Sequence, residues 1–593
     1  MNFRFHSLAL FFLFCLPGAA PADAAAPKKI LHVLLTSPEA SLDPALASDV
    51  QSLSINENIF DPPLRYDYLA RPVKLQANTL RAMPEVSADG KTYLLHLQPG
   101  IFFTPDAAFK GQARELIAED YVYSIKRLYD PAIKSPWLFM FEGKLLGDDK
   151  LLLADKAKKF NPDQTIAGLQ ALDRYTLRLQ LKAPDNNFLF QLATPAVAAV
   201  AREVVDNYAD QIGSHPVGTG PFMMGQWQRN FKMQLLANPA YRKVIFSSVA
   251  GGDAADLAIV KNLQGKRLPR VDSIEIKVIE EQQSRVLGFL NQEFDYLEQL
   301  PPPLADMVLR DGKLRPELAS KGIQFALFSP LQTYYMWMNM DDPLIGGYTP
   351  EKIALRRAIA LSYDSKEDIR LMEKGLALPA QSVLPPNVLG YDPRYRSPLS
   401  HDLKLANALL DKFGYQRGQD GYRHLPDGQP LSLTMHSLAA TTGRLRDEVW
   451  HKNMEAIGVR IRFKTDKHSE IIKAARLGKV QMTEANWIAD FPDGENFYQL
   501  LYGPNSGRAN YARFNLPAFN TLYEQSRSLS DSPQRQRLYH DMAQLVHGYT
   551  PWVLRIHPLS ADIWQPWLKN YKRHPVDFTS WRYVDLEKNS TVD

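Results

Sequence analysis

Strand-like and helix-like segments alternate along almost the whole of this 593-residue chain. Ser273 to Ile279 alternates apolar and polar residues as a strand does, and a helical pattern follows from Glu281 to Leu290. Lys352 to Tyr363 repeats the helical spacing, and Val459 to Phe463 is again a strand pattern. This alternation predicts the α/β class with mixed sheets.

The N-terminus has the pattern of a secretion signal. Arg4 provides a positive charge, and Leu8 to Leu16 forms an apolar run that stops at Pro17-Gly18. A membrane-spanning helix needs about 18 or more apolar residues, which this run lacks. Ala22-Asp23-Ala24 is an A-x-A cleavage pattern, so we expect cleavage after Ala24 and export of a soluble mature chain.

Cysteine use limits how the mature chain is held together. Cys15 is the only cysteine and lies inside the predicted signal segment. Phe14 precedes it where a lipidated cysteine needs a small residue, so we do not expect a lipid anchor. Structural disulfides and thiolate metal sites are therefore excluded from the mature chain, and its stability must come from apolar cores.

Charge and motif content give no sign of catalysis, a metal or nucleic acid. Lys and Arg number 69 against 65 Asp and Glu, a net charge of +4 without a dense basic run. The chain has no G-x-S-x-G and no H-E-x-x-H, and Glu85 stands where a phosphate loop ending in Gly90-Lys91-Thr92 needs its first glycine. We expect no cofactor, no metal site and no catalytic residues.

An unusual segment in the middle of the chain carries a family resemblance. Pro216 to Phe222 (P-V-G-T-G-P-F) places two glycines between two prolines, which forces a tight, irregular backbone. This segment resembles the V-G-T-G-P-(F/Y) motif of the family 5 extracytoplasmic solute-binding proteins, the oligopeptide- and dipeptide-binding receptors of ABC importers. Further motifs of that family are matched in the same order by Leu42-Asp43-Pro44, Ala118 to Ser124, Ala171 to Leu177, Gln292 to Asp295, Arg356 to Ile359, and Trp487 to Asp493.

The resemblance implies a two-lobed periplasmic binding protein fold with a hinge between the lobes and an extra subdomain in the first lobe. Lobe I is then expected over 25–65, 195–300 and 545–593, the extra subdomain over 66–194, and lobe II over 301–544, with hinges near Leu300 and Gly548. Two segments depart from the family pattern, 144–165 and 246–265, and the second is interpreted as an inserted loop.

The same resemblance points to one ligand-binding residue above others. In peptide receptors of this family, the aspartate that matches Asp490 pairs with the ammonium of the peptide's N-terminal residue. An alternative role for Asp490 is to organise the turn at Pro492-Asp493-Gly494. The residues before it, Asn486, Trp487, Ile488 and Ala489, are expected to form the strand edge along which an extended peptide lies, although Trp487 fits the core equally well.

The resemblance therefore implies a monomeric periplasmic receptor that closes on a peptide and then docks on ABC permease subunits at the membrane. A different ligand on the same fold stays open: an oligosaccharide, haem, a nickel chelate or a cell-wall fragment. A second alternative is a secreted hydrolase or a chaperone-like protein that uses the cleft.

Overall fold

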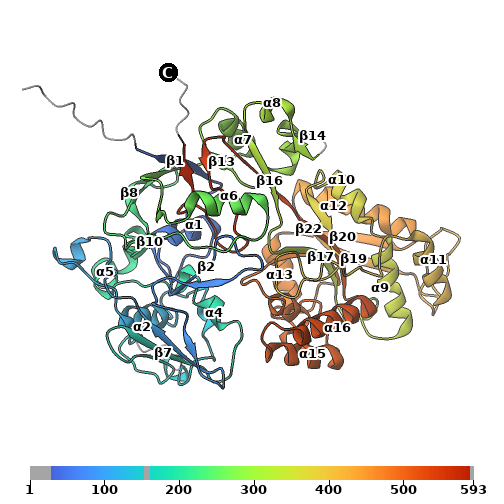
Figure 1. The fold of residues 1–593 in the computed structure, drawn as a ribbon. Coiled ribbons are helices and arrows are strands. Elements are labelled where there is room, and N and C mark those ends of the chain that lie inside the picture. The colour runs from blue at the N-terminus through green and yellow to red at the C-terminus, as the bar shows by residue number, and fades with distance from the viewer. Residues whose placement is uncertain (1–27, 153–159, 311, 588–593) are drawn as a thin grey trace, which may run out of the picture.

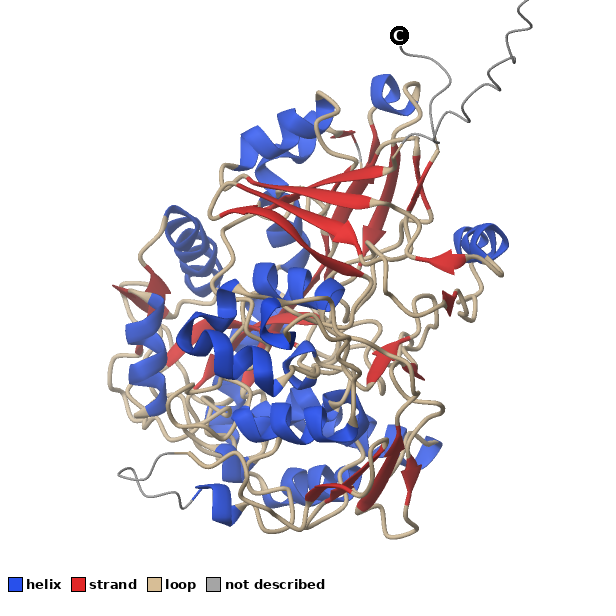
Figure 2. Cartoon of the chain, turned by 90° about the vertical axis from the view of Figure 1, so that its left-hand side faces the viewer, coloured by secondary structure: helices blue, strands red, loops and turns tan. Residues whose placement is uncertain are grey.

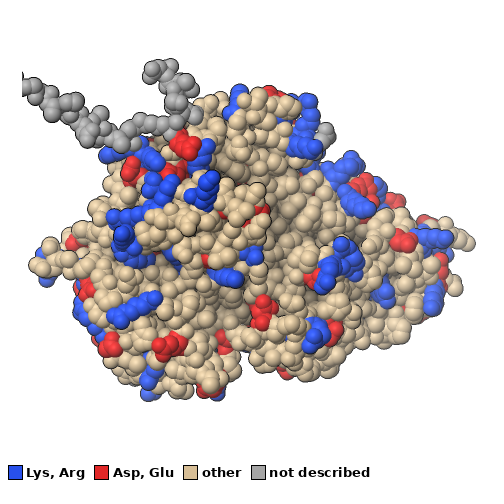
Figure 3. Space-filling view, in the orientation of Figure 1, with Lys and Arg blue, Asp and Glu red and all other residues tan. Residues whose placement is uncertain are grey.

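The computed structural model describes residues 28–152, 160–310 and 312–587 and has two lobes side by side (Figure 1). The chain mixes parallel and antiparallel sheets with many helices, which agrees with the predicted α/β class. Basic and acidic side chains are interspersed over the face in Figure 3, in line with the small net charge of +4. The predicted signal segment lies outside the described residues, as does part of the 144–165 segment.

The first lobe is built on a four-stranded sheet in the order β1-β12-β9-β8. Its strands are β1 (Ile30–Leu35), β12 (Ser273–Val278), β9 (Lys232–Ala237) and β8 (Phe222–Gln228). β1 runs parallel to β12, and every second residue of β1 is buried in one apolar core. The strand predicted at 273–279 is thus confirmed as a central strand of this lobe.

A smaller sheet lies at the opposite end of the first lobe (Figure 2). It has the order β4-β5-β7-β6 and consists of β4 (Glu85–Val86), β5 (Thr92–His96), β7 (Thr176–Gln180) and β6 (Leu169–Ala171). Helix α2 (Ala118–Arg127) packs beside β6 and β7 and shares their core. Acidic residues in the first turn of α2 and basic residues in its last turn match the helix dipole.

The Pro216–Phe222 segment lies directly against the end of α1 (Val50–Ile59). A Cβ atom on Gly218 would lie 2.0 Å from the carbonyl oxygen of Ile59, and one on Gly220 would lie 2.6 Å from it. The Gly220 N–H donates to that same oxygen at 2.8 Å. Both positions therefore need glycine because backbone approaches backbone there.

We expect Gly218→Ala to lower the free energy of unfolding by about 1–3 kcal/mol, the usual cost of forcing extra volume into a packed site. Gly548→Ala is the control, because a Cβ there meets nothing within 4 Å. That control should leave stability unchanged or raise it by up to about 1 kcal/mol through helix propensity. Urea unfolding of both variants checks this, and equal stabilities would contradict it.

The second lobe is built on a six-stranded sheet in the order β18-β22-β17-β21-β19-β20. Its strands are β18 (Ala377–Pro379), β22 (Trp552–Pro558), β17 (Gln332–Met338), β21 (Met482–Ile488), β19 (Ser432–Leu438) and β20 (Arg460–Asp466). Helices α9 (Pro350–Ser362), α11 (Leu403–Lys412) and α12 (Thr441–Ala456) share the core on one face of this sheet. Helices α15 (Pro517–Arg527) and α16 (Pro533–Tyr549) share the core on the other face. Alternate side chains of β17 (Gln332–Met338) point to opposite faces of the sheet. Tyr335 and Trp337 pack with α16, whereas Met336 and Met338 pack with α9.

Two strand-to-strand connections join this sheet to the first lobe. β16 (Gln324–Phe328) and β23 (Ser560–Trp564) pair with each other in a three-stranded sheet with β13 (Tyr296–Leu297). Their continuations, β17 and β22 (Trp552–Pro558), pair with each other in the six-stranded sheet. The chain therefore passes between the lobes at residues 329–331 and at Leu559.

The interpretation of 246–265 as a loop is wrong for its second half. Residues Ala254–Leu263 form helix α6, capped by Asp253, whose side chain accepts from the N–H of Asp256. The ammonium of Lys572, far away in sequence, pairs with both aspartates. This distant partner holds the start of the helix in place.

No helix in the described ranges combines the length and apolar character needed to cross a membrane.

Candidate functional site

The strand β21 (Met482–Ile488) has an open backbone edge. On one side it pairs with β17 over its whole length, from Gln332 opposite Ile488 to Met338 opposite Met482. On the other side it pairs with β19 (Ser432–Leu438) only at its first two residues. From Glu484 onward this edge has no strand partner in the described chain, so its N–H and C=O groups can accept another extended backbone.

The side chains along this edge alternate between the two faces of the sheet. Asn486 and Ile488 are exposed, whereas Trp487 and Ala489 are half-buried and pack against the core beneath α16. The Trp487 indole N–H donates to Asn496 at 2.7 Å. The structure thus places Trp487 with its ring on the core side and its backbone on the open edge.

Asp490 follows directly after the open edge and is fixed by Asn496. The Asn496 amide donates to the Asp490 carboxylate at 2.9 Å, and the Asp490 N–H donates to the Asn496 side-chain oxygen at 3.2 Å. Asn496 itself is only 1% exposed. The buried amide therefore holds both Trp487 and Asp490 in a set orientation.

The Asp490 carboxylate has no positively charged partner in the described chain. Although its surface is accessible to water, surrounding protein desolvates the carboxyl and raises its pKa, and the hydrogen bond from Asn496 only partly opposes this. In the described part of the chain no Lys, Arg or His nitrogen lies within 4 Å of it. A desolvated carboxylate without a counter-charge favours binding of a positively charged group.

The nearby Glu484 differs from Asp490 because its carboxylate already has cationic partners. Its carboxylate lies 3.0 Å from Arg555 and 3.6 Å from Arg446, and it accepts the indole N–H of Trp450 at 2.7 Å. Burial raises the pKa of Glu484 to about 7 despite the positive charge of Arg446. Of these two acidic groups, Asp490 is the one without a cationic partner in the described chain.

The turn after Asp490 is organised by Asp493. Its two carboxylate oxygens accept from the guanidinium of Arg535 at 2.6 and 2.9 Å, and one of them also accepts the Tyr539 hydroxyl at 2.8 Å. The Asp493 oxygen further accepts the N–H of Glu495. Asp493 therefore anchors this turn, and the Asp490 carboxylate also takes part in it by accepting from Asn496.

Residues of the first lobe lie opposite this turn. The Asn187 amide donates to Glu495 at 2.7 Å, and the ring of Phe190 lies parallel to that of Phe491 with centroids 6.5 Å apart. Asn186 donates to the carbonyl of Arg527 at 2.7 Å. The segment around Asp490 is therefore at the junction of the two lobes.

Several of these residues were missed by the sequence analysis. Asn496 and Phe190 hold or border the site, yet no spacing rule connects them to Asp490. Phe491, which faces Phe190, lies within the matched segment Trp487 to Asp493. Only the W-x-A-D motif pointed to this region. The parts of the chain that the structure describes contain no group of three or more His, Cys, Asp or Glu side chains placed to hold a metal ion.

Two lobes on separate sheets, joined by two crossing connections and bordering an open strand edge, define a two-lobed solute-binding protein. The profile of the bacterial extracellular solute-binding proteins, family 5 (middle region), matches residues 42–509. The chain belongs to this family, which confirms the resemblance found in the sequence.

Relatives and solved structures cover nearly the whole chain. Di/tripeptide-binding protein 2 of Pseudomonas aeruginosa is 25% identical over 97% of this chain and 98% of its own length. Heme-binding protein A of Haemophilus influenzae is 24% identical over 85% of this chain and 83% of its own. The unliganded open form of the murein tripeptide-binding protein MppA has a TM-score of 0.72 at 21% identity, covering 95% of this chain and 98% of that one. DppA of Helicobacter pylori in complex with the peptide STSA has a TM-score of 0.68 at 21% identity, covering 95% and 99%. These structures confirm the two-lobed fold.

Proposed function

We propose that this protein is a periplasmic receptor of an ABC importer and captures a peptide between its lobes. The observation that carries the proposal is the carboxylate of Asp490, which has no cationic partner in the described chain and lies at the end of an open strand edge. The peptide's N-terminal ammonium would pair with Asp490, and its backbone would hydrogen-bond to the edge formed by Asn486 to Ala489. Backbone recognition accommodates many side chains, which suits a receptor for diverse peptides.

Support for a peptide also comes from the relatives. One of those above is named for di- and tripeptides, and the Escherichia coli dipeptide-binding protein is 21% identical over 88% of this chain. The family fits a binding role without turnover, and we propose no catalytic residue and no cofactor. The mature chain would start at Ala25, act as a monomer and deliver its ligand to permease subunits at the membrane.

The crossing connections suggest how the lobes move. We propose hinges at residues 329–331 and at Leu559, in place of the positions near Leu300 and Gly548 expected from the sequence. The strand pairing supports this shift, because residues on either side of each connection belong to different sheets. A peptide that contacts both lobes would stabilise the closed form by that differential contact.

Native mass spectrometry of the protein purified from the periplasm without refolding tests the ligand class. We expect additional masses that fragment as short peptides. A defined non-peptide mass would instead support another ligand on the same fold. Two relatives motivate this alternative, because one is named for heme and another as probably deoxycholate-binding. Steady turnover of added peptides or glycans would overturn the receptor proposal in favour of a hydrolase.

The raised pKa of Asp490 predicts how peptide affinity depends on pH. Binding of an ammonium favours the charged carboxylate and lowers this pKa, so the free protein takes up a proton at a pH where the complex does not. Affinity should therefore fall as the pH drops through the raised pKa of the free protein. Calorimetric titrations across the acid range check this, with unfolding followed at the same pH values. In Asp490→Asn the acid limb should be absent, and its persistence would contradict the assignment.

A further inference from the structure

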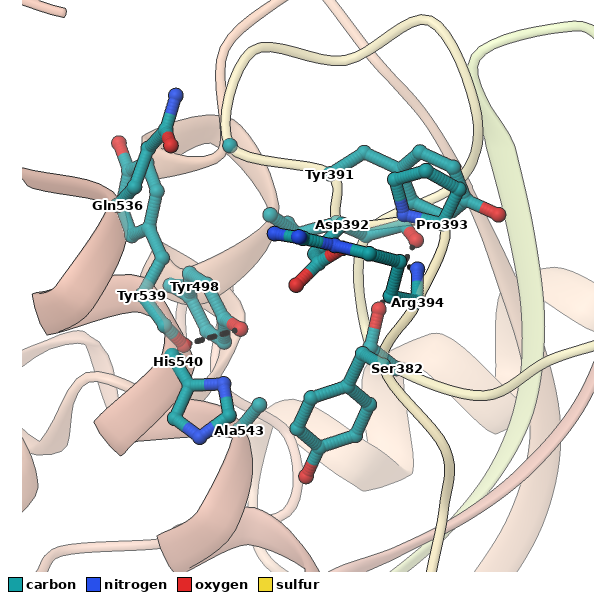
Figure 4. A pocket seen from close by; sticks show the side chains of 13 residues that line it. Ser382, Tyr391, Asp392, Pro393, Arg394, Tyr498, Gln536, Tyr539, His540 and Ala543 are labelled. Carbon is teal, nitrogen blue, oxygen red and sulfur yellow. Dashed lines mark hydrogen bonds and ion pairs between the residues drawn. The ribbon is translucent and has the colours of Figure 1, made fainter. Parts of the chain in front are cut away.

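A second groove lies in lobe II, between the segment 390–398 and helix α16. Two adjoining cavities of about 350 and 450 Å³ share four lining residues, Asp392, Arg394, Tyr395 and His540. Figure 4 shows the first cavity, with His540 and Tyr539 of α16 on one side and Asp392 and Arg394 of the segment on the other. This groove is separate from Asp490, which lines neither cavity.

The groove has an excess of positive charge. Its lining includes Arg357, Arg394 and Arg396 but only one acidic residue, Asp392. Asp392 is already occupied, because it accepts from the N–H and Nε of Arg394 at 2.9 and 3.3 Å. In the described ranges neither Arg357 nor Arg396 has an acidic group within 4 Å. Nε of Arg357 is also buried without an acceptor, which is costly for a charged group.

A buried histidine contributes a third unpartnered group. His547 is only 5% exposed, lines the second cavity and has no hydrogen-bond partner for its Nε2. Its Nδ1 lies 3.0 Å from the hydroxyl of Tyr395 and 2.8 Å from the carbonyl oxygen of Ala543. A carbonyl oxygen can only accept, so the Ala543 contact places the proton of the neutral ring on Nδ1 and leaves Nε2 as an acceptor. Burial lowers the pKa of His547, which favours this neutral ring, so the arginines are the anion donors of the groove.

We infer that this groove binds a small oxyanion, a phosphate or a carboxylate, between Arg357 and Arg396. One nitrogen of Arg396 donates to the carbonyls of Pro393 and Tyr395, but neither guanidinium has an acidic partner in the described ranges. Their remaining N–H groups can donate to an oxyanion, which offers several acceptors close together. Guanidinium groups fit the geometry of both phosphate and carboxylate oxygens. This site is independent of the proposed peptide receptor function, and either proposal can fail alone.

The test is calorimetric titration of the mature protein with inorganic phosphate and, separately, with citrate, in chloride buffers of constant ionic strength. We expect saturable binding of at least one probe, and the stronger one identifies the preferred oxyanion. Arg357→Gln and Arg396→Gln should each weaken binding by about tenfold, the effect of losing one charge-assisted hydrogen bond. Arg537→Gln is the matched control, because it removes the same charge from an exposed position on α16 that lines neither cavity.

Three outcomes are informative. Weakening in Arg357→Gln and Arg396→Gln but not in Arg537→Gln supports the site. Absence of saturable binding with both probes overturns it, and so does equal affinity in all three variants. Arg396 is exposed, so its replacement keeps the test valid should Arg357→Gln alter folding.

Discussion

Replacing Asp490 with asparagine is expected to weaken the binding of a peptide with a free N-terminus by about 2–5 kcal/mol, or about 30-fold to 4,000-fold. The carboxylate has no cationic partner in the described chain, and the surrounding protein raises its pKa, so the ligand's ammonium would be its counter-charge. Asparagine keeps nearly the same shape and a hydrogen bond to Asn496 while removing the charge. Calorimetric titration with trialanine measures the change.

Two controls separate charge pairing from general damage. Asp531→Asn removes an exposed carboxylate elsewhere in lobe II and should leave the affinity unchanged. N-acetylated trialanine lacks the ammonium, so it should bind the native protein weakly and lose little more in Asp490→Asn. Unchanged affinity for trialanine in Asp490→Asn would contradict the proposed pairing of this carboxylate with the peptide ammonium.

Asp493→Ala is expected to lower the free energy of unfolding by about 3–5 kcal/mol. Asp493 is 1% exposed and Arg535 is 2% exposed, and two hydrogen bonds of 2.6 and 2.9 Å join them. Removing the carboxylate leaves the buried guanidinium with only the longer 3.9 Å contact to Glu495, and it also leaves the Tyr539 hydroxyl without its acceptor. Urea unfolding monitored by tryptophan fluorescence measures the loss.

The matched comparison is Asp163→Ala, which removes one partner of the exposed ion pair with Arg202. Exposed pairs contribute about 0–1 kcal/mol, so this variant should stay close to the native stability. The double variant Asp493→Leu with Arg535→Met should recover much of the loss because it leaves no buried charge unpaired. If Asp493→Ala costs no more than Asp163→Ala, the buried pair does not hold the turn after Asp490.

Regular elements with a clear period were predictable from the sequence. The helix expected at 352–363 is α9 (Pro350–Ser362), which begins two residues earlier, at Pro350. The strand expected at 459–463 is β20 (Arg460–Asp466). In both, local propensity and core packing favour the same conformation.

Elements that depend on distant partners were not predictable. Helix α6 starts just after Gly251-Gly252, which suggested a loop, and Lys572 stabilises its first turn from the other end of the sequence. The contact between Asp490 and Asn496 crosses an irregular turn that no periodicity describes. The connections between the lobes do coincide with prolines in the sequence. Pro330 lies between β16 and β17, and Pro558 ends β22 just before β23 begins.

A crystal structure of the mature protein with trialanine tests the central claim most directly. We predict that the peptide lies between the lobes in an extended form, with its ammonium within about 3 Å of the Asp490 carboxylate, as a charge-assisted hydrogen bond requires. Its backbone should pair with the open edge of β21 after Glu484. A peptide bound away from this edge, or one whose carboxyl end faces Asp490, would contradict the account.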